Sequence, residues 1–154
     1  MNTNENDREA RGDLMERLQE SLATPASSPT FELVHKELAR HIVGAAIEVH
    51  RHLGPGQLER VYQAALELEL ELRGMPFRRQ VPVPLMYKGK AIGEFFLDLV
   101  VDGKVIVELK AVERYNPLFT AQVISYLRAA KLHLGLLMNF NSPVLWRGVR
   151  RIVL

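Results

Sequence analysis

The sequence predicts one α/β domain in which helices flank a mixed β-sheet. Long stretches with apolar residues at three- and four-residue steps are typical of amphipathic helices. Several shorter runs are almost continuously apolar, as in strands covered on both faces. Along the chain these segments follow the order α, α, β, β, β, α, β, β, with no internal repeat. A single domain of this class is therefore the first expectation.

The composition narrows the class of protein. The chain has 154 residues, of which 47% are apolar, and this is enough for one domain with its own core. It has no cysteine, so disulfides and thiolate zinc sites are excluded, as suits a reducing cytoplasm. No apolar run is long enough to span a membrane, and the first residues do not resemble a signal peptide. We expect a soluble cytoplasmic protein without a membrane partner.

Charge is distributed unevenly between two parts of the chain. Residues 1–30 carry six acidic and three basic side chains, and no core-forming pattern, so we expect a flexible N-terminal extension there. The remaining residues, 31–154, carry seventeen basic and twelve acidic side chains. This predicted domain is mildly basic, which is compatible with a polyanionic partner without demonstrating one.

The expected elements follow from periodicity and from turn residues. Pro82 and Pro84 lie within an alternating segment, and proline in a strand indicates an edge position. Asn116 followed by Pro117 predicts a capped helix start. Helices are expected over residues 31–53, 57–73 and 116–131, and strands over residues 81–85, 93–101, 104–112, 133–140 and 148–154.

Ionisable residues interrupt two of the most apolar strands. Asp98 lies on one strand, and Glu108 and Lys110 lie on the next. Charged groups are costly to bury unless they are paired or bind a metal ion. Side chains alternate across a strand, so Glu108 and Lys110 share one face of the sheet while Leu109 points to the other.

The turn between these strands decides whether Asp98 joins that face. A two-residue turn at Asp102 and Gly103 would place Asp98 on the opposite face. A three-residue loop that also includes Lys104, with Gly103 left-handed, would place Asp98 directly opposite Glu108. The pattern alone does not decide between them. We predict the three-residue loop, because it accounts for the charges on these strands. Two bare carboxylates facing each other would repel, so this register requires a cation between them.

This arrangement predicts metal-assisted chemistry. Asp98 and Glu108 would hold a hard divalent ion such as Mg²⁺, together with a backbone carbonyl and waters. The ion would polarise a phosphodiester and bind the attacking water. Lys110 would orient that water or help to deprotonate it, and would stabilise negative charge. The alternative is a strand end that emerges into solvent, where the acids and the lysine form surface ion pairs.

Other polar residues are candidates for the same site. Glu59, near the start of the second helix, could be a third metal ligand or bind the water, although an acid in a first turn often only favours the helix dipole. Gln122 and Tyr126 are one turn apart on the third helix and could line the cleft, with Gln122 acting in catalysis toward a phosphate or a metal-bound water, or could simply cap the sheet. Tyr62 could line the cleft as well, although a tyrosine at this position is more often a core or rim residue. Basic residues of the last strand could contact phosphate, but an exposed strand face is the favoured interpretation (Arg147, Arg150 and Arg151).

Together these residues resemble the PD-(D/E)XK nuclease superfamily, and within it the small bacterial group named for a GxxExxY motif. The motif corresponds to Gly56, Glu59 and Tyr62, and the core of the superfamily to Asp98, Glu108 and Lys110. The segment from Gln122 to Tyr126 is similar to the QxxxY motif of RecB-type nucleases. One departure is Leu97, which stands where the superfamily name has proline.

The resemblance implies a restriction-endonuclease-like αβββαβ core and a nuclease that depends on Mg²⁺ or Mn²⁺. The expected substrate is DNA or RNA, and a separate protein partner could supply targeting. Two further interpretations remain open at this point. One is a catalytically inactive module that keeps the fold and binds nucleic acid or a protein partner. The other is a purely structural α/β domain, which would leave the three charged strand residues without an explanation.

Overall fold

The structure, a computed structural model, describes residues 34–154. The expected extension, residues 1–30, lies outside the described residues. The helices are α3 (Lys36–Leu53), α4 (Glu59–Leu72) and α5 (Pro117–Ala130), with a short 3₁₀ helix η1 (Leu145–Gly148). The strands are β1 (Phe77–Tyr87), β2 (Lys90–Val101), β3 (Val105–Lys110), β4 (Leu134–Asn139) and β5 (Val149–Val153). The element order is the expected one, and η1 is an addition that the periodicity did not predict.

The strands form one mixed five-stranded sheet with the order β1-β2-β3-β4-β5. Neighbouring strands are antiparallel except β3 and β4, which are parallel. The edge position predicted from Pro82 and Pro84 is confirmed, because both lie in β1, at one edge of the sheet. The central strands β3 and β4 are buried along almost their whole length, which explains their nearly continuous apolar sequence. The predicted α/β class with a mixed sheet is therefore confirmed.

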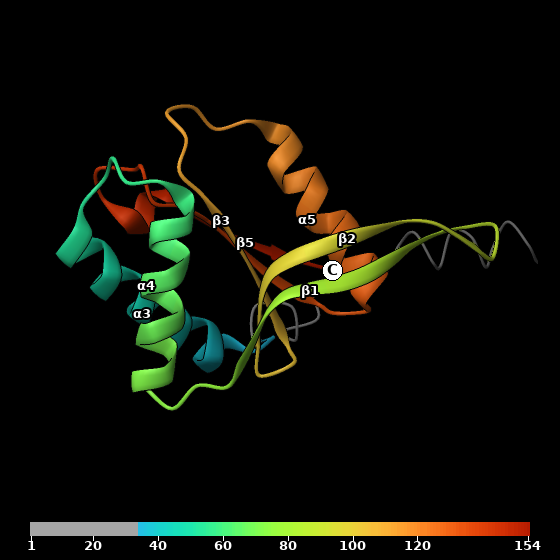
Figure 1. Cartoon of the computed structure of the whole chain (residues 1–154), viewed down its shortest axis with the longest axis horizontal. Helices are drawn as coiled ribbons and strands as arrows, with labels where there is room; N and C mark the ends of the chain where they lie inside the picture. Colours follow the sequence, from blue (N-terminus) through green and yellow to red (C-terminus); the bar gives the residue numbers. More distant parts are fainter. Residues whose placement is uncertain (1–33) are drawn as a thin grey trace, which may run out of the picture. The chain divides into compact units, whose positions relative to one another are not determined.

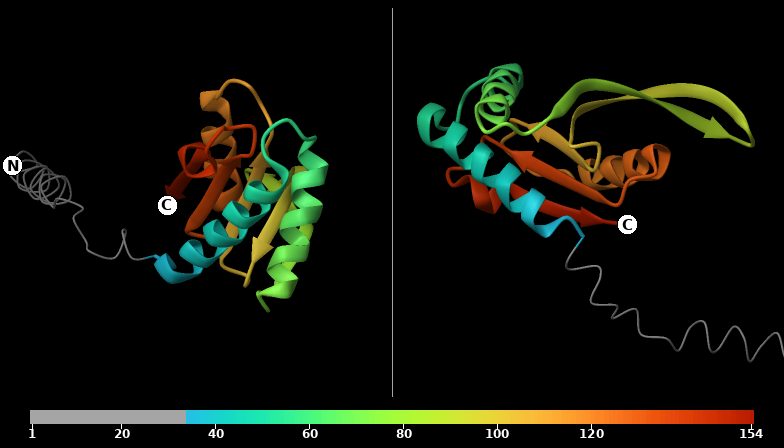
Figure 2. Two further views of the ribbon diagram at one scale, coloured as in Figure 1. Left: turned by 90° about the vertical axis from the view of Figure 1, so that its left-hand side faces the viewer. Right: turned by 90° about the horizontal axis from the view of Figure 1, so that it is seen from below.

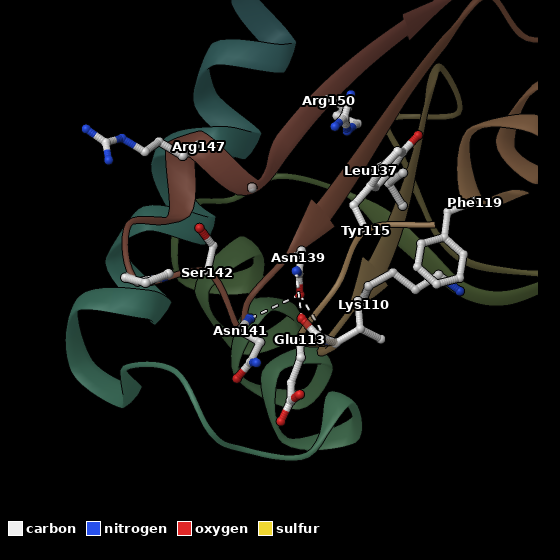
Figure 3. A pocket seen from close by; sticks show the side chains of 13 residues that line it. Lys110, Glu113, Tyr115, Phe119, Leu137, Asn139, Asn141, Ser142, Arg147 and Arg150 are labelled. Atoms are coloured by element: carbon white, nitrogen blue, oxygen red, sulfur yellow. Dashed lines mark hydrogen bonds between the residues drawn. The ribbon is translucent and has the colours of Figure 1, made fainter. Parts of the chain in front are cut away.

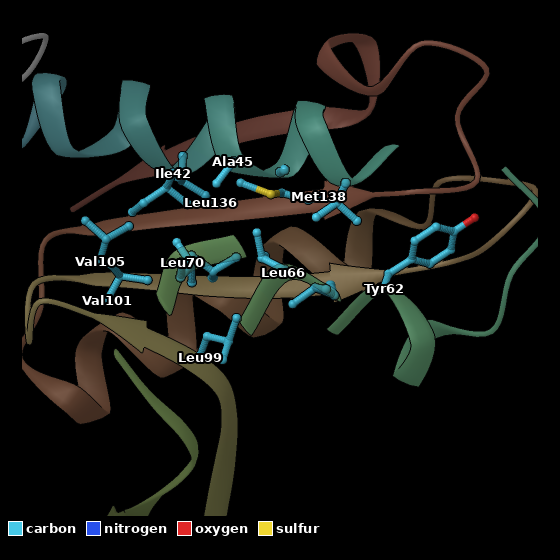
Figure 4. Packing of buried hydrophobic residues seen from close by; sticks show 14 of the residues in the cluster. Ile42, Ala45, Tyr62, Leu66, Leu70, Leu99, Val101, Val105, Leu136 and Met138 are labelled. Carbon is cyan, nitrogen blue, oxygen red and sulfur yellow. The ribbon is translucent and has the colours of Figure 1, made fainter. Parts of the chain in front are cut away.

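Helices cover both faces of the sheet. Helices α3 and α4 lie on one face and α5 lies on the other (Figures 1 and 2). The core beneath α3 and α4 joins residues such as Ile42, Leu66 and Leu136 (Figure 4). The core beneath α5 is separate and contains Val123 and Ile106. Burial on both faces fixes the register of the central strands, because a one-residue slip would exchange the two sets of side chains.

The start of α5 follows the predicted cap. Asn116 accepts a hydrogen bond from the backbone N–H of Leu118 at 2.9 Å, and Pro117 is the first helical residue. Helix α5 then packs closely on β4. A β-carbon at Gly135 would lie only 2.6 Å from Cγ1 of Val123, so glycine is needed for this approach.

The β1–β2 hairpin is a long ribbon that extends away from the helices (Figure 2). Its two strands pair along most of their length. In contrast, β2 pairs with β3 only from Leu99 opposite Val107 to Val101 opposite Val105, close to the turn. Beyond these pairs the two strands separate, and Asp98 and Glu108 lie where the pairing stops. Among residues 34–154, no helix is both long and apolar enough to cross a membrane.

Candidate active site

The turn between β2 and β3 has the three-residue form. Val101 pairs with Val105, which leaves Asp102, Gly103 and Lys104 as the loop. Asp102 and Gly103 are left-handed, with φ of 52° and 63°. The N–H of Lys104 donates to the carbonyl of Val101 at 3.0 Å and closes the turn. The predicted loop is confirmed, including its left-handed glycine.

This register brings Asp98 next to Glu108. Continued by one residue beyond Leu99 and Val107, it sets the two acidic residues opposite each other. The backbones of the two strands no longer pair there. Instead, Oδ2 of the Asp98 side chain accepts a hydrogen bond from the backbone N–H of Leu109 at 3.0 Å. On the other side of Asp98, the β1–β2 ladder skips Gln80, whose φ is 46°. Both neighbouring strands are therefore irregular at Asp98.

Glu108 is the most unusual ionisable group among the described residues. Only 5% of its surface is exposed, and its Oε2 is buried without a hydrogen-bond partner. Burial raises the pKa of Glu108 to about 9, assisted by the charge of Asp98 and a hydrogen bond with it, whereas Lys110 acts in the opposite direction. When no cation is bound, burial thus favours the protonated form of Glu108.

Lys110 lies on the α5 face of the sheet, as Glu108 does. Leu109, between them, packs instead into the core under α3 and α4, as the alternation predicts. The side chain of Lys110 is half-buried, and its Nζ lies 4.5 Å from the centre of the Phe119 ring on α5. Lys110 thus brings a positive charge close to the two carboxylates.

Glu59 is the first residue of α4 and approaches the acids from that helix. Partial burial raises its pKa, the charge of Asp98 raises it further, and Lys110 lowers it. Its carboxylate is therefore coupled to the site. Within residues 34–154, however, no three acidic or histidine side chains lie close enough together to hold a metal ion. A role for Glu59 as a third direct ligand remains a prediction.

Tyr126 and Gln122, on α5, belong to the same electrostatic environment. Tyr126 is 5% exposed and packs edge-on against Phe95 at 4.9 Å. Burial and the charges of Glu108 and Asp98 raise the pKa of Tyr126 to about 12, whereas a hydrogen bond with Gln122 lowers it. Tyr126 is consequently a neutral hydroxyl group beside the acids at physiological pH. Gln122 itself is exposed.

Tyr62 is a core residue, the role that its position favoured over one in the cleft. Its ring is fully buried and stacks on Phe140 at 4.7 Å. Its hydroxyl donates to the carbonyl of Gly54 at 2.5 Å and accepts from the N–H of Gln57 at 3.0 Å. Tyr62 therefore fixes the loop that leads into α4. The physical reason is that a buried phenol needs hydrogen-bond partners, and this loop supplies both.

A cavity of about 260 Å³ adjoins Lys110 on the α5 side; we call it the Lys110 pocket (Figure 3). Of the predicted site residues, Lys110 contributes to its lining. Arg150 is exposed on β5, as the sequence favoured, and its guanidinium lies over the ring of Tyr115, at 3.7 Å from the ring centre. No local pattern could link two residues so far apart in the chain. The principal lining side chains are Lys110, Tyr115, Phe119, Asn139, Arg147 and Arg150.

Comparison with known proteins gives one result. A family model for the PD-(D/E)XK nuclease superfamily matches residues 36–152, which is most of the chain and all but the edges of the described part. Neither the curated proteins nor the solved structures contain a match to this sequence.

Proposed function

The chain belongs to the PD-(D/E)XK nuclease superfamily, and from this premise we propose that it is a nuclease dependent on a divalent metal ion. Members of this superfamily are usually nucleases, and the mixed sheet with helices on both faces agrees with its fold. The proposed substrate is DNA or RNA, and the proposed reaction is hydrolysis of a phosphodiester bond. The observation that carries the proposal is the buried pair Asp98 and Glu108.

The acidic pair fits a hard cation. Oε2 of Glu108 is buried with no partner, next to a second carboxylate, and such a group calls for an explanation. Oxygen atoms are the ligands that Mg²⁺ and Mn²⁺ prefer. The backbone carbonyl of Leu109 points toward the same side of β3 as its N–H, which bonds to Asp98, so it could be a third oxygen donor. Asp98 and Glu108 would hold the ion, which when bound supplies Lewis-acid activation of the phosphodiester.

The remaining site residues would stabilise charge and position the attacking water through hydrogen bonds. Lys110 offers a positive charge that would stabilise the negative charge of the transition state. Glu59, with its raised pKa, would accept a hydrogen bond from the attacking water and orient it. Tyr126, neutral at physiological pH, would donate a hydrogen bond toward the acids, and Gln122 would hold the phenol in place.

We also propose that the chain belongs to the GxxExxY group within the superfamily. Gly56 has a φ of 98°, a conformation that favours glycine, and it precedes Glu59 in the loop that Tyr62 fixes. These contacts give each motif position a physical task. Gly56 permits the turn, Tyr62 anchors it, and Glu59 is carried toward the acidic pair.

The test is cleavage of labelled single-stranded and double-stranded DNA and RNA with Mg²⁺, Mn²⁺ or EDTA. We expect cleavage with a divalent ion that is lost in EDTA and falls by at least about a hundredfold in Asp98→Asn and in Lys110→Ala. Glu94→Gln, which removes an exposed acid from the same strand as Asp98, is the matched control and should keep full activity. Activity that persists in Asp98→Asn would indicate a contaminating nuclease and refute the proposal.

A second measurement does not depend on turnover. Mn²⁺ at a hundred times its dissociation constant should stabilise the folded protein by about 2.7 kcal/mol, and Asp98→Asn should abolish this gain. Stabilisation by the metal without cleavage of any nucleic acid would indicate an intact metal site in a protein that is not a nuclease. The absence of both stabilisation and cleavage would favour the inactive nuclease-fold module.

A further inference from the structure

Cationic and aromatic side chains contact each other in the Lys110 pocket. The Arg150 guanidinium stacks on Tyr115, the Lys110 ammonium lies over Phe119, and the two rings meet edge to face with 6.3 Å between their centres. Tyr115 nevertheless remains 40% exposed. Proteins that bind single-stranded nucleic acids use such aromatic rings and arginine planes to stack unpaired bases. The surfaces of the pocket therefore match the chemistry of a nucleobase.

The charge of the pocket matches a phosphate. Three cations line it, with one acid, Glu113. Within residues 34–154, none of these four groups takes part in a salt bridge. Glu113 points away from Arg150, and Arg147 points outward at the rim (Figure 3). Lys110 and Arg150 thus supply the inner positive charge, and in the described part of the chain neither forms a salt bridge with a carboxylate.

The walls of the pocket are held in place by two polar side chains, the half-buried Asn139 and the buried His50. Asn139 accepts hydrogen bonds from the N–H groups of Val112 and Asn141, at 3.1 and 3.2 Å, and donates to the carbonyl of Val112 at 2.9 Å. From the opposite side, Nε2 of His50 donates to the carbonyl of Ser142 at 2.8 Å. These bonds fix the segments that follow β3 and β4. A pocket formed in advance binds its ligand without the cost of ordering the walls.

We infer that the Lys110 pocket binds one unstacked nucleotide of a single-stranded substrate, beside the phosphodiester bond at the acidic pair. The volume of about 260 Å³ lies at the small end of ligand pockets, which suits one nucleotide rather than a base pair. Lys110 connects the two places, because it lines the pocket and lies two residues after Glu108 on the same face of β3. The inference rests on the proposed nuclease function and specifies its substrate as single-stranded nucleic acid or an unpaired end.

The test measures binding without cleavage. Fluorescence anisotropy of labelled single-stranded and blunt double-stranded oligonucleotides of equal length is recorded with the full chain in EDTA. We expect tighter binding of the single strand, a preference that falls about tenfold in Tyr115→Ala. Arg150→Lys keeps the charge but loses the planar group, and it should reduce the preference in the same direction. Arg40→Lys, on the exposed surface of α3, is the matched control for Arg150→Lys and should bind as the unmodified chain does.

Each other outcome overturns the inference. Equal losses for single and double strands in Tyr115→Ala would reduce the pocket to a nonspecific basic surface. Unchanged binding in both pocket variants, with folding verified by circular dichroism, would leave the pocket without a role in nucleic-acid binding. No binding of any oligonucleotide in EDTA would refute it as well, because the proposed contacts do not involve the metal ion.

The two proposals fail in different experiments. Cleavage that requires Asp98 but has no preference for single strands would support the nuclease and reject the single-strand pocket. Selective binding of single strands through Tyr115 without cleavage under any metal would support the pocket and reject the nuclease.

Discussion

Substitution of Glu108 by glutamine should stabilise the metal-free protein, and the gain should grow with pH. The pKa of Glu108 is raised from an ordinary value of 4.5 to about 9. Below pH 4.5 the folded and unfolded chains both carry the proton. Between these two values the unfolded chain ionises while the folded chain keeps its proton, so the free energy of unfolding falls as the pH rises.

The size of the expected gain follows from the pH range between the unfolded and folded pKa values of Glu108. Each pH unit changes the free energy of unfolding by at most about 1.4 kcal/mol, so the loss between pH 4.5 and pH 7 has a ceiling of about 3 kcal/mol. Glutamine cannot ionise, and its amide can still donate a hydrogen bond to Asp98, as the protonated carboxyl does. We expect a gain below this ceiling, about 1–3 kcal/mol at pH 7 and less than about 1 kcal/mol at pH 5.

The assay is urea unfolding in EDTA at several pH values, with the midpoint and slope fitted for each protein. Glu94→Gln removes an exposed carboxyl from β2 and should change the free energy of unfolding by less than about 0.5 kcal/mol at every pH. A gain in Glu108→Gln that is the same at pH 5 and pH 8 would refute the reasoning, since it would arise from packing instead of ionisation. A loss at pH 8 would refute it more directly.

Three further substitutions test how the fold supports the site. Tyr62→Phe removes the hydroxyl bound to Gly54, and it should cost about 1–3 kcal/mol in urea unfolding and speed amide exchange in the loop before α4. Gly135→Ala sets a methyl group against Val123, and we expect a loss of about 1–3 kcal/mol, measured as a lower thermal midpoint. Asn139→Leu removes three hydrogen bonds that hold the Lys110 pocket, and it should weaken binding of single-stranded oligonucleotides as well as stability.

Each of these three predictions has an outcome that would contradict it. Unchanged amide exchange in Tyr62→Phe would mean that the loop is fixed by other contacts. An unchanged thermal midpoint in Gly135→Ala would show that α5 moves away from β4 without cost. If Asn139→Leu is destabilised but binds oligonucleotides normally, the hydrogen bonds of Asn139 are not needed for binding in the pocket.

Local patterns were sufficient for the fold. The apolar stripe of α3 and the Asn116–Pro117 start of α5 each follow from neighbouring residues, and the structure contains both elements. The two prolines of β1 located the edge of the sheet for the same reason, because a missing N–H is a local property. The short helix η1 was missed because its single turn has no periodicity to detect.

Part of the site could also be predicted from the sequence. Alternation set Glu108 and Lys110 on one face. The three-residue loop, which the structure has, was predicted because a cation shared by Asp98 and Glu108 would account for two acids on such apolar strands. The sequence left the role of Tyr62 open between core and cleft, because spacing along a helix gives the direction of a side chain but not its hydrogen-bond partners. Whether a tyrosine borders a cleft or fixes a loop depends on what packs against it.

The sequence by itself therefore determined the order of helices and strands and the identity of the acidic pair, Asp98 and Glu108. Both depend on residues that are close along the chain. Only the tertiary structure decided the pKa of Glu108 and the stacking of Arg150 on Tyr115. Burial and stacking arise between strands, helices and loops that are distant in sequence, and the packing of the whole sheet sets their distances.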